Sequence, residues 1–78
     1  GLYSSIALNA ANEVAVGAFL NGKIRFGDIM NCIRIALDSI KEQGISDLDS
    51  ILSMDRYARS VTEGIINSGL QQKTVSQI

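Results

Sequence analysis

The sequence predicts an all-α fold with three main helices, and three observations support this prediction. Apolar residues recur at helical spacing along most of the chain, and no stretch alternates apolar and polar residues over the length of a strand. Glycines and short polar runs separate three such segments, which we expect to span residues 6–20, 28–43 and 54–68. The chain has no proline and no internal repeat. Its 78 residues therefore predict one small helical bundle.

The first helix is rich in alanine, the strongest helix former, which occurs five times within residues 6–20. Apolar residues cover almost its whole circumference, and only the narrow sector of Asn9, Asn12 and Glu13 interrupts them. A helix that is apolar nearly all round is usually a buried helix. We therefore expect it to form the centre of the bundle, with Ser4 or Ser5 as its N-cap.

The two later helices are predicted to be amphipathic, with residues 28–43 showing the cleaner separation of apolar and charged faces. Gly44 should end that helix. The run from Ser46 to Asp49 is a capping-box variant that should open a short helical turn. Ser53 is then the expected N-cap of the last main helix.

Charged residues on these two helices should form surface ion pairs one turn apart. Arg34 is expected to pair with Asp38, and Arg59 with Glu63, each pair being worth about 0.2–0.5 kcal/mol. After the last helix, residues 70–78 are mostly polar and should form a frayed tail.

The predicted core consists of apolar residues on the inward faces of the helices. A chain of this length buries only about 60–65% of its unfolded surface, so the core must be small. Ile24 and Phe26 in the first connector should plug one end of it, and packing is a better interpretation of this connector than a binding role for Arg25. The predicted core residues are Leu8, Ala11, Ala15, Phe19, Ile29, Ile33, Leu37, Ile40, Leu52, Tyr57, Val61 and Ile65.

Composition excludes several classes of protein. The net charge is −1, and no basic patch of the kind that binds nucleic acid is present. The apolar runs are too short to span a membrane, and no secretory leader is recognisable. A single cysteine excludes an internal disulfide and favours a reducing compartment. Because the chain does not begin with methionine, we expect it to be a piece of something longer or a processed product.

Asn9, Asn12 and Glu13 are the most concentrated polar group, at positions i, i+3 and i+4 of the first helix. They could bind a polar ligand or a metal ion. They could instead hydrogen-bond to neighbouring backbone or to another domain across a tight interface, because a buried amide must be paired. The structural interpretation is favoured, since few other titratable groups are expected to converge there.

No other residue type in the chain predicts a chemical site. Cys32 lies on an apolar stripe and is expected to be a core residue rather than a reactive thiol. Asp47, Asp49 and Asp55 lack the twelve-residue calcium loop, so caps are the better interpretation. There is no histidine, and one cysteine cannot complete a usual zinc site. The sequence thus predicts no catalytic, cofactor-binding or metal-binding residue.

Several motifs resemble one known family. LNAANE spans Leu8 to Glu13, IRF spans Ile24 to Phe26, and an Asp-Ile pair follows at Asp28. The segment ILSMDRYAR from Ile51 to Arg59 is similar to that family's last helix. Together they resemble the C-terminal domain of 1-deoxy-D-xylulose 5-phosphate reductoisomerases, over most of the chain. One departure is Gly27, where the family often has threonine.

The resemblance implies a parent enzyme of the methylerythritol phosphate route to isoprenoids that uses NADPH and Mg²⁺ or Mn²⁺. The family's cofactor, metal and phosphate sites lie in other domains, so no catalytic residue is carried over. The resemblance implies a non-catalytic structural domain of about four helices that braces the catalytic domain. One of those helices should be missing here, because the chain begins at Gly1. A cytoplasmic bacterial protein is implied, or a plastid one in a plant or alga.

Two alternatives come from other classes of function. One is a free-standing helical module that binds a partner helix in its apolar groove. The other is a helix-turn-helix DNA binder, which the acidic balance disfavours.

The first helix also predicts self-association. Two amphipathic helices cannot surround a helix that is apolar on almost every side, and monomers seldom expose a large apolar patch. We therefore expect a two-fold homodimer in which two partial bundles complete one another. Exchange of the last helix, with residues 44–46 as the hinge, is a second route to such a dimer.

Overall fold

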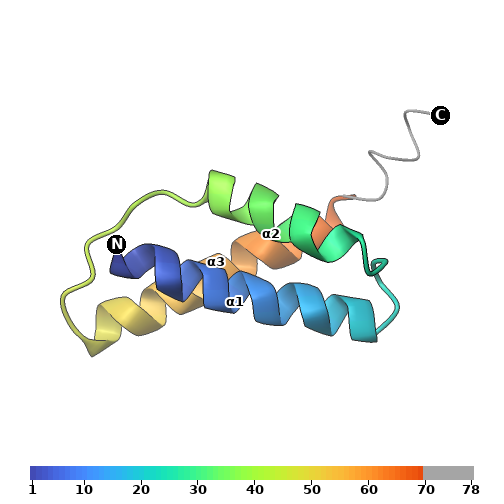
Figure 1. Cartoon of the computed structure of the whole chain (residues 1–78). Helices are drawn as coiled ribbons and strands as arrows, with labels where there is room; N and C mark the ends of the chain where they lie inside the picture. Colours follow the sequence, from blue (N-terminus) through green and yellow to red (C-terminus); the bar gives the residue numbers. More distant parts are fainter. Residues whose placement is uncertain (70–78) are drawn as a thin grey trace.

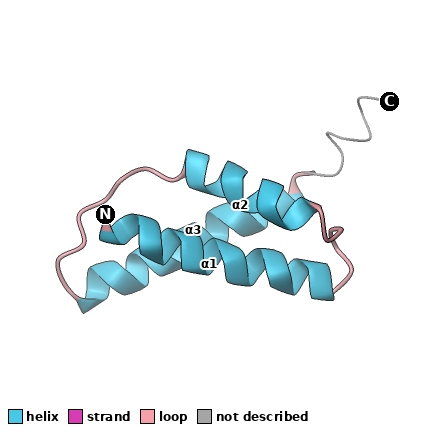
Figure 2. Ribbon diagram, in the orientation of Figure 1, coloured by secondary structure: helices cyan, strands magenta, loops and turns pink. Residues whose placement is uncertain are grey.

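The computed structural model describes residues 1–69, and these residues form three helices and no strand (Figure 2). They are α1 (Leu2–Leu20), α2 (Asp28–Ser39) and α3 (Leu48–Asn67). Figure 1 shows α1 and α3 running in the same direction, with the shorter α2 returning antiparallel to both. The predicted all-α fold is therefore confirmed. The expected fraying of residues 70–78 lies outside the described residues.

The core lies around α1, which packs against both other helices and shares its largest interface with α3. One cluster joins α1 to α2 and the first connector, through Ala11, Ala15, Cys32, Ile33 and Ala36 among others. The second cluster joins α1 to the start of α3, with Met54 and Ala58 against small residues of α1. Alanines at the contact allow the helix backbones to approach closely, which explains why one helix can be central to so thin a bundle.

Small side chains fill this core and large ones surround it. Seven of the twelve buried apolar residues are alanines. Among described side chains, the largest that are fully buried are those of Met54, Thr62 and Cys32, and the Thr62 hydroxyl donates to the Ala58 carbonyl at 2.7 Å. The large apolar residues that remain exposed are Leu2, Leu8, Leu20, Phe26, Met30, Leu48 and Leu52.

The predicted core residues fall into three groups. Ala11, Ala15, Ile33 and Ile40 are buried. Leu8 and Leu52 do not belong to the core, since 49% and 45% of their surfaces are exposed. Both lie on helix sectors that no other described helix covers, which the periodicity of a single helix cannot show. The remaining six are partly buried against the two clusters: Phe19, Ile29, Leu37, Tyr57, Val61 and Ile65.

Helix α1 begins at Leu2, four residues before the predicted start. Gly1 is its N-cap, and no side chain caps it, so the prediction of Ser4 or Ser5 as cap was wrong. The extra turn is stabilised by tertiary packing, because Tyr3 lies against the cluster formed with α3.

Helix α2 ends at Ser39 rather than at residue 43. Ile40 leaves the helix with an extended backbone (φ −88°, ψ 127°), and its side chain is buried in the cluster between α1 and α3. The four residues after it are exposed and polar, so a further helical turn would bury nothing. Gly44 consequently does not end the helix.

Helix α3 is continuous from Leu48, so the prediction of a separate turn followed by an N-cap at Ser53 was wrong. A capping box does form, between Asp47 and Ser50. The Asp47 carboxylate accepts from the Ser50 backbone N–H at 2.9 Å, and the Ser50 hydroxyl accepts from the Asp47 N–H at 3.0 Å. This box provides hydrogen-bond partners for backbone N–H groups at the start of α3, and the helix then continues without interruption to residue 67.

Candidate functional site

An open apolar groove of about 550 Å³ runs between α1 and α2. It continues over α1 into a second hollow of about 450 Å³, and Leu8 lines both. We call the residues that line these two hollows the α1–α2 face. They are Ser5, Leu8, Asn9, Asn12, Met30, Asn31, Ile33, Arg34, Leu37 and Asp38.

The α1–α2 face is apolar at its centre. Met30 exposes 72% of its surface and Leu8 about half, while Ile33 and Leu37 form the floor between them. We take this apolar centre as the candidate contact surface of the domain. The sequence predicted that part of the first helix is left uncovered, but it did not predict that Met30 and Leu37 of α2 continue this surface beside Leu8.

Charged residues form one rim of the face. Arg34 Nη1 lies 4.0 Å from Asp38 Oδ2, and both side chains are mostly exposed. Arg34 also donates to the Asn31 side chain. The predicted Arg34–Asp38 pair is thus present, as a loose contact that contributes little to stability.

The structure divides the polar sector of Asn9, Asn12 and Glu13 between two surfaces. Asn9 and Asn12 are exposed on the α1–α2 face, and neither makes a side-chain hydrogen bond to any of residues 1–69. Glu13 instead accepts from Arg59 Nη2 at 2.7 Å. The glutamate therefore has a structural partner in α3, whereas the two amides have donor and acceptor groups available for a partner surface.

Arg59 links α1 to α3. Besides Glu13, it donates from Nε to Asp55 Oδ2 at 2.8 Å. The hydrogen bond to Asp55, followed by that to Glu13, raises the pKa of Arg59 above its ordinary value. The predicted Arg59–Glu63 pair was wrong, because side chains on a helix lean toward its N-terminus and bring this guanidinium to Asp55.

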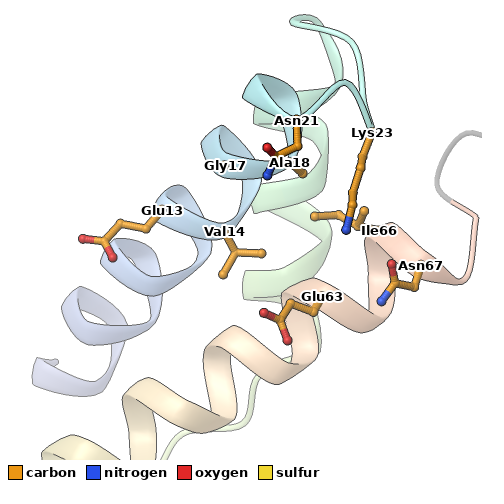
Figure 3. A pocket seen from close by; sticks show the side chains of 9 residues that line it. All are labelled: Glu13, Val14, Gly17, Ala18, Asn21, Lys23, Glu63, Ile66 and Asn67. Atoms are coloured by element: carbon orange, nitrogen blue, oxygen red, sulfur yellow. The ribbon is translucent and has the colours of Figure 1, made fainter.

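A third hollow, of about 290 Å³, lies between the C-terminal halves of α1 and α3 (Figure 3). Lys23 reaches from the connector toward Asn67, while Glu63 projects from α3 toward the space between the helices. Glu13 points away from this end. The side chains that line this hollow come from separate elements and include no pairing of a nucleophile with a base.

The remaining candidate residues have structural roles. Cys32 is fully buried, and its burial, with a smaller effect of the Asp28 carboxylate, raises the pKa of its thiol. Asp47 caps α3 and Asp55 pairs with Arg59, so these aspartates do not converge. Within residues 1–69 no group of three or more histidine, cysteine, aspartate or glutamate side chains could hold a metal ion. In that same range, no helix has both the length and the apolar character needed to cross a membrane.

Comparison with known proteins places this fold in a family. The family model for the DXP reductoisomerase C-terminal domain matches residues 1–61, which is most of the chain. The chain belongs to this family. The resemblance carried by the sequence motifs is therefore confirmed, and with it the assignment as a C-terminal domain.

Curated relatives agree with this assignment. The 1-deoxy-D-xylulose 5-phosphate reductoisomerase of Actinobacillus pleuropneumoniae serotype 5b is 44% identical over 86% of this chain. The protein of the same name from Tolumonas auensis is 49% identical over 76% of the chain, and that from Colwellia psychrerythraea 35% over 99%. The matches cover 17%, 15% and 19% of these relatives, so the chain spans about a sixth of their length.

Proposed function

We propose that this domain has a structural role in a 1-deoxy-D-xylulose 5-phosphate reductoisomerase, and that its α1–α2 face packs against the rest of that enzyme. The observation that supports this role is the distribution of apolar side chains. Alanines fill the core, while Leu8 and Met30 are exposed around a groove. We infer that this surface has a partner, since the match covers only 17% of the A. pleuropneumoniae relative and leaves most of that enzyme outside this chain.

The polar groups of the face fit such a partner. Asn9 and Asn12 each offer a side-chain donor and acceptor beside the apolar centre, and neither is engaged within residues 1–69. Amides at the margin of an apolar contact fix its register, because an amide left unpaired on burial costs about 1–3 kcal/mol. We infer that these two side chains bond to backbone or polar groups of the parent enzyme.

The chemistry of the parent belongs, in this proposal, to its other domains. We infer a cytoplasmic oxidoreductase that reduces with NADPH and depends on Mg²⁺ or Mn²⁺. The residues described here do not fit a metal site, since no three candidate ligands converge. We therefore assign no catalytic step to this chain and expect it to be inactive alone.

Complementation between two polypeptides tests the structural role. The segment that matches this chain is removed from the A. pleuropneumoniae reductoisomerase, and the 78-residue chain is added back as a separate polypeptide. We expect substrate-dependent NADPH oxidation to rise with added chain and to saturate. A folded chain that restores no activity and does not bind the truncated enzyme would contradict the proposal.

A matched pair of variants locates the contact. Leu8→Ser should abolish the restoration, whereas Leu52→Ser, at a leucine of similar exposure on α3, should retain it. Circular dichroism of both variants controls for folding. If the two variants restored activity equally, the contact would not lie on the α1–α2 face.

The free-standing interaction module remains the alternative function. The reading frame that surrounds the gene separates the two, since the structural role requires a dinucleotide-binding domain encoded upstream in the same frame.

A further inference from the structure

The connector between α2 and α3 contains four exposed residues in a row, Lys41, Glu42, Gln43 and Gly44. We propose that this segment is a site of endoproteolytic modification, at which a glutamate-specific endopeptidase hydrolyses the bond between Glu42 and Gln43, and that the two products remain together as a folded, non-covalent pair. The inference concerns the domain itself and does not rest on its docking to a parent enzyme.

The backbone of this segment is open to an endopeptidase. Residues 41–46 have no helical structure, and none of them has a positive φ. Residues 41–45 make no hydrogen bond to any of residues 1–69, so their N–H and C=O groups are available to pair with an extended strand of a protease. An added Cβ at Gly44 would meet nothing within 4 Å, and Figure 1 shows the connector arcing past the N-terminal end of α1.

Two isoleucines anchor the segment at its ends. Ile40 is buried in the cluster between α1 and α3, and Ile45 packs against the same cluster. The backbone is extended both where it leaves α2 at Ile40 and where it enters α3 at Asp47 (φ −155°, ψ 178°). The exposed residues therefore lie between two anchored points, and a protease reaches them without unfolding either helix.

The class of protease follows from where the glutamates lie. The chain contains three, Glu13, Glu42 and Glu63, and residues 70–78 contain none. Glu13 lies within α1 and Glu63 within α3, so cleavage at either one requires local unfolding of a helix. Glu13 is also held by Arg59 Nη2 at 2.7 Å. A glutamate-specific enzyme therefore meets one accessible bond in the folded chain.

Hydrolysis of this bond leaves both parts of the fold intact. Water adds across the amide, so that Glu42 gains a terminal carboxylate and Gln43 a terminal ammonium group. One product contains α1 and α2, and the other contains α3 together with its capping box between Asp47 and Ser50. The cut breaks no hydrogen bond within residues 1–69, because the residues beside it make none.

The two products meet mainly along the interface between α1 and α3, which is the largest in the bundle. Met54 and Ala58 of α3 are fully buried against alanines of α1, and Arg59 bonds to Glu13 across the same interface. Hydrolysis removes only the covalent tether, which makes the association of α3 depend on protein concentration. The cleaved domain should therefore stay folded at high concentration and lose stability on dilution.

Limited digestion of the wild-type chain with a glutamate-specific endopeptidase tests the site, with intact-mass spectrometry as the readout. We expect fragments 1–42 and 43–78 to form at least about tenfold faster than any product cut at Glu13 or Glu63. The same chain unfolded in urea should be cut at all three glutamates. Comparable rates at the three sites in the folded chain would overturn the proposal. Resistance of Glu42 under conditions that cleave the unfolded chain would also overturn it.

Two variants that each remove one glutamate form a matched control. Glu42→Gln should leave the folded chain uncut over the same time, whereas Glu63→Gln should still yield the wild-type fragments. Circular dichroism of both variants checks that they are folded. A Glu42→Gln chain that is cut as fast as the wild type would place the accessible bond elsewhere and contradict the assignment.

The cleaved wild-type chain tests the folded pair. It should keep its helical circular dichroism signal and elute as one species in size-exclusion chromatography at high micromolar concentration. Its thermal midpoint should fall on dilution by more than that of the intact chain. Loss of the helical signal on cleavage, or separation of the two fragments at high micromolar concentration, would contradict this part of the proposal.

Discussion

Asp47 shows how a single residue controls where a helix begins. Its carboxylate accepts the Ser50 backbone N–H, and the Ser50 hydroxyl returns a bond to the Asp47 N–H. The bond from the Ser50 backbone, with a smaller effect of its hydroxyl, lowers the pKa of Asp47. The ionised carboxylate is therefore the form that caps α3. The three residues before Asp47 have no helical structure, and the Ser46 backbone N–H also donates to the Ser50 hydroxyl at 2.9 Å.

This pKa shift predicts a pH dependence of stability. A carboxyl group whose pKa is lower in the folded state contributes stability above its unfolded pKa, and that contribution is lost as the pH falls through the folded pKa. We expect urea midpoints to fall between about pH 5 and pH 2. Asp47→Asn keeps a capping side chain but cannot titrate, so its midpoint should fall less over the same range. If the urea midpoints of the wild type and of Asp47→Asn fell equally with pH, the capping box would not form in solution.

At the scale of the element, α1 is the helix that tolerates enlargement least. Ala11 and Ala15 are fully buried in its middle, where α2 and α3 approach. A larger side chain there must push a neighbouring helix outward or adopt a poor rotamer. The same helix also carries Gly17, where an added Cβ would meet nothing within 4 Å.

Ala15 and Gly17 predict opposite effects on stability when their side chains are enlarged. Ala15→Leu should lower the free energy of unfolding by about 1–3 kcal/mol through overpacking. Gly17→Ala should raise it by about 0.5–1 kcal/mol, because alanine loses less backbone entropy on folding and has room. Thermal melts of the two variants measure both changes. An unchanged or higher midpoint for Ala15→Leu would mean that this face is loosely packed.

The helices themselves could be predicted from the sequence, but their ends could not. Periodicity and the alanine content located all three helices, because those signals are local to each helix. The end of α2 depends on Ile40 finding a place between α1 and α3, and the start of α1 depends on Tyr3 packing beside α3. Both are tertiary effects. The candidate site was predicted only in part: the sequence indicated an uncovered side of the first helix, but only the assembled bundle places Met30 of α2 beside Leu8.

At the scale of the molecule, the described part is a thin body, 45 Å long and 16 Å across its shortest axis. Such a shape has little interior, and its described polar residues lie at caps, in ion pairs or on the surface, apart from the buried Thr62. The three hollows described above are open, and within residues 1–69 no group of three or more candidate metal ligands converges.

This shape predicts that the isolated chain binds neither NADPH nor Mg²⁺ or Mn²⁺. Within residues 1–69 no strand leads into a phosphate-binding loop, and no set of carboxylates converges. Isothermal titration calorimetry should give only heats of dilution with each of the three. Specific, saturable binding at micromolar concentration would contradict the structural role. The truncated reductoisomerase completed with this chain provides the positive control for NADPH.

The alanine core also changes what a mutational scan of this domain would look like. In most domains, truncating buried residues to alanine is the most damaging class of change, at about 2–5 kcal/mol for a leucine, isoleucine or methionine. Here most buried positions are already alanine and have almost nothing left to lose. Substitutions that enlarge a buried side chain should therefore harm folding, whereas substitutions that truncate an exposed apolar side chain should harm assembly.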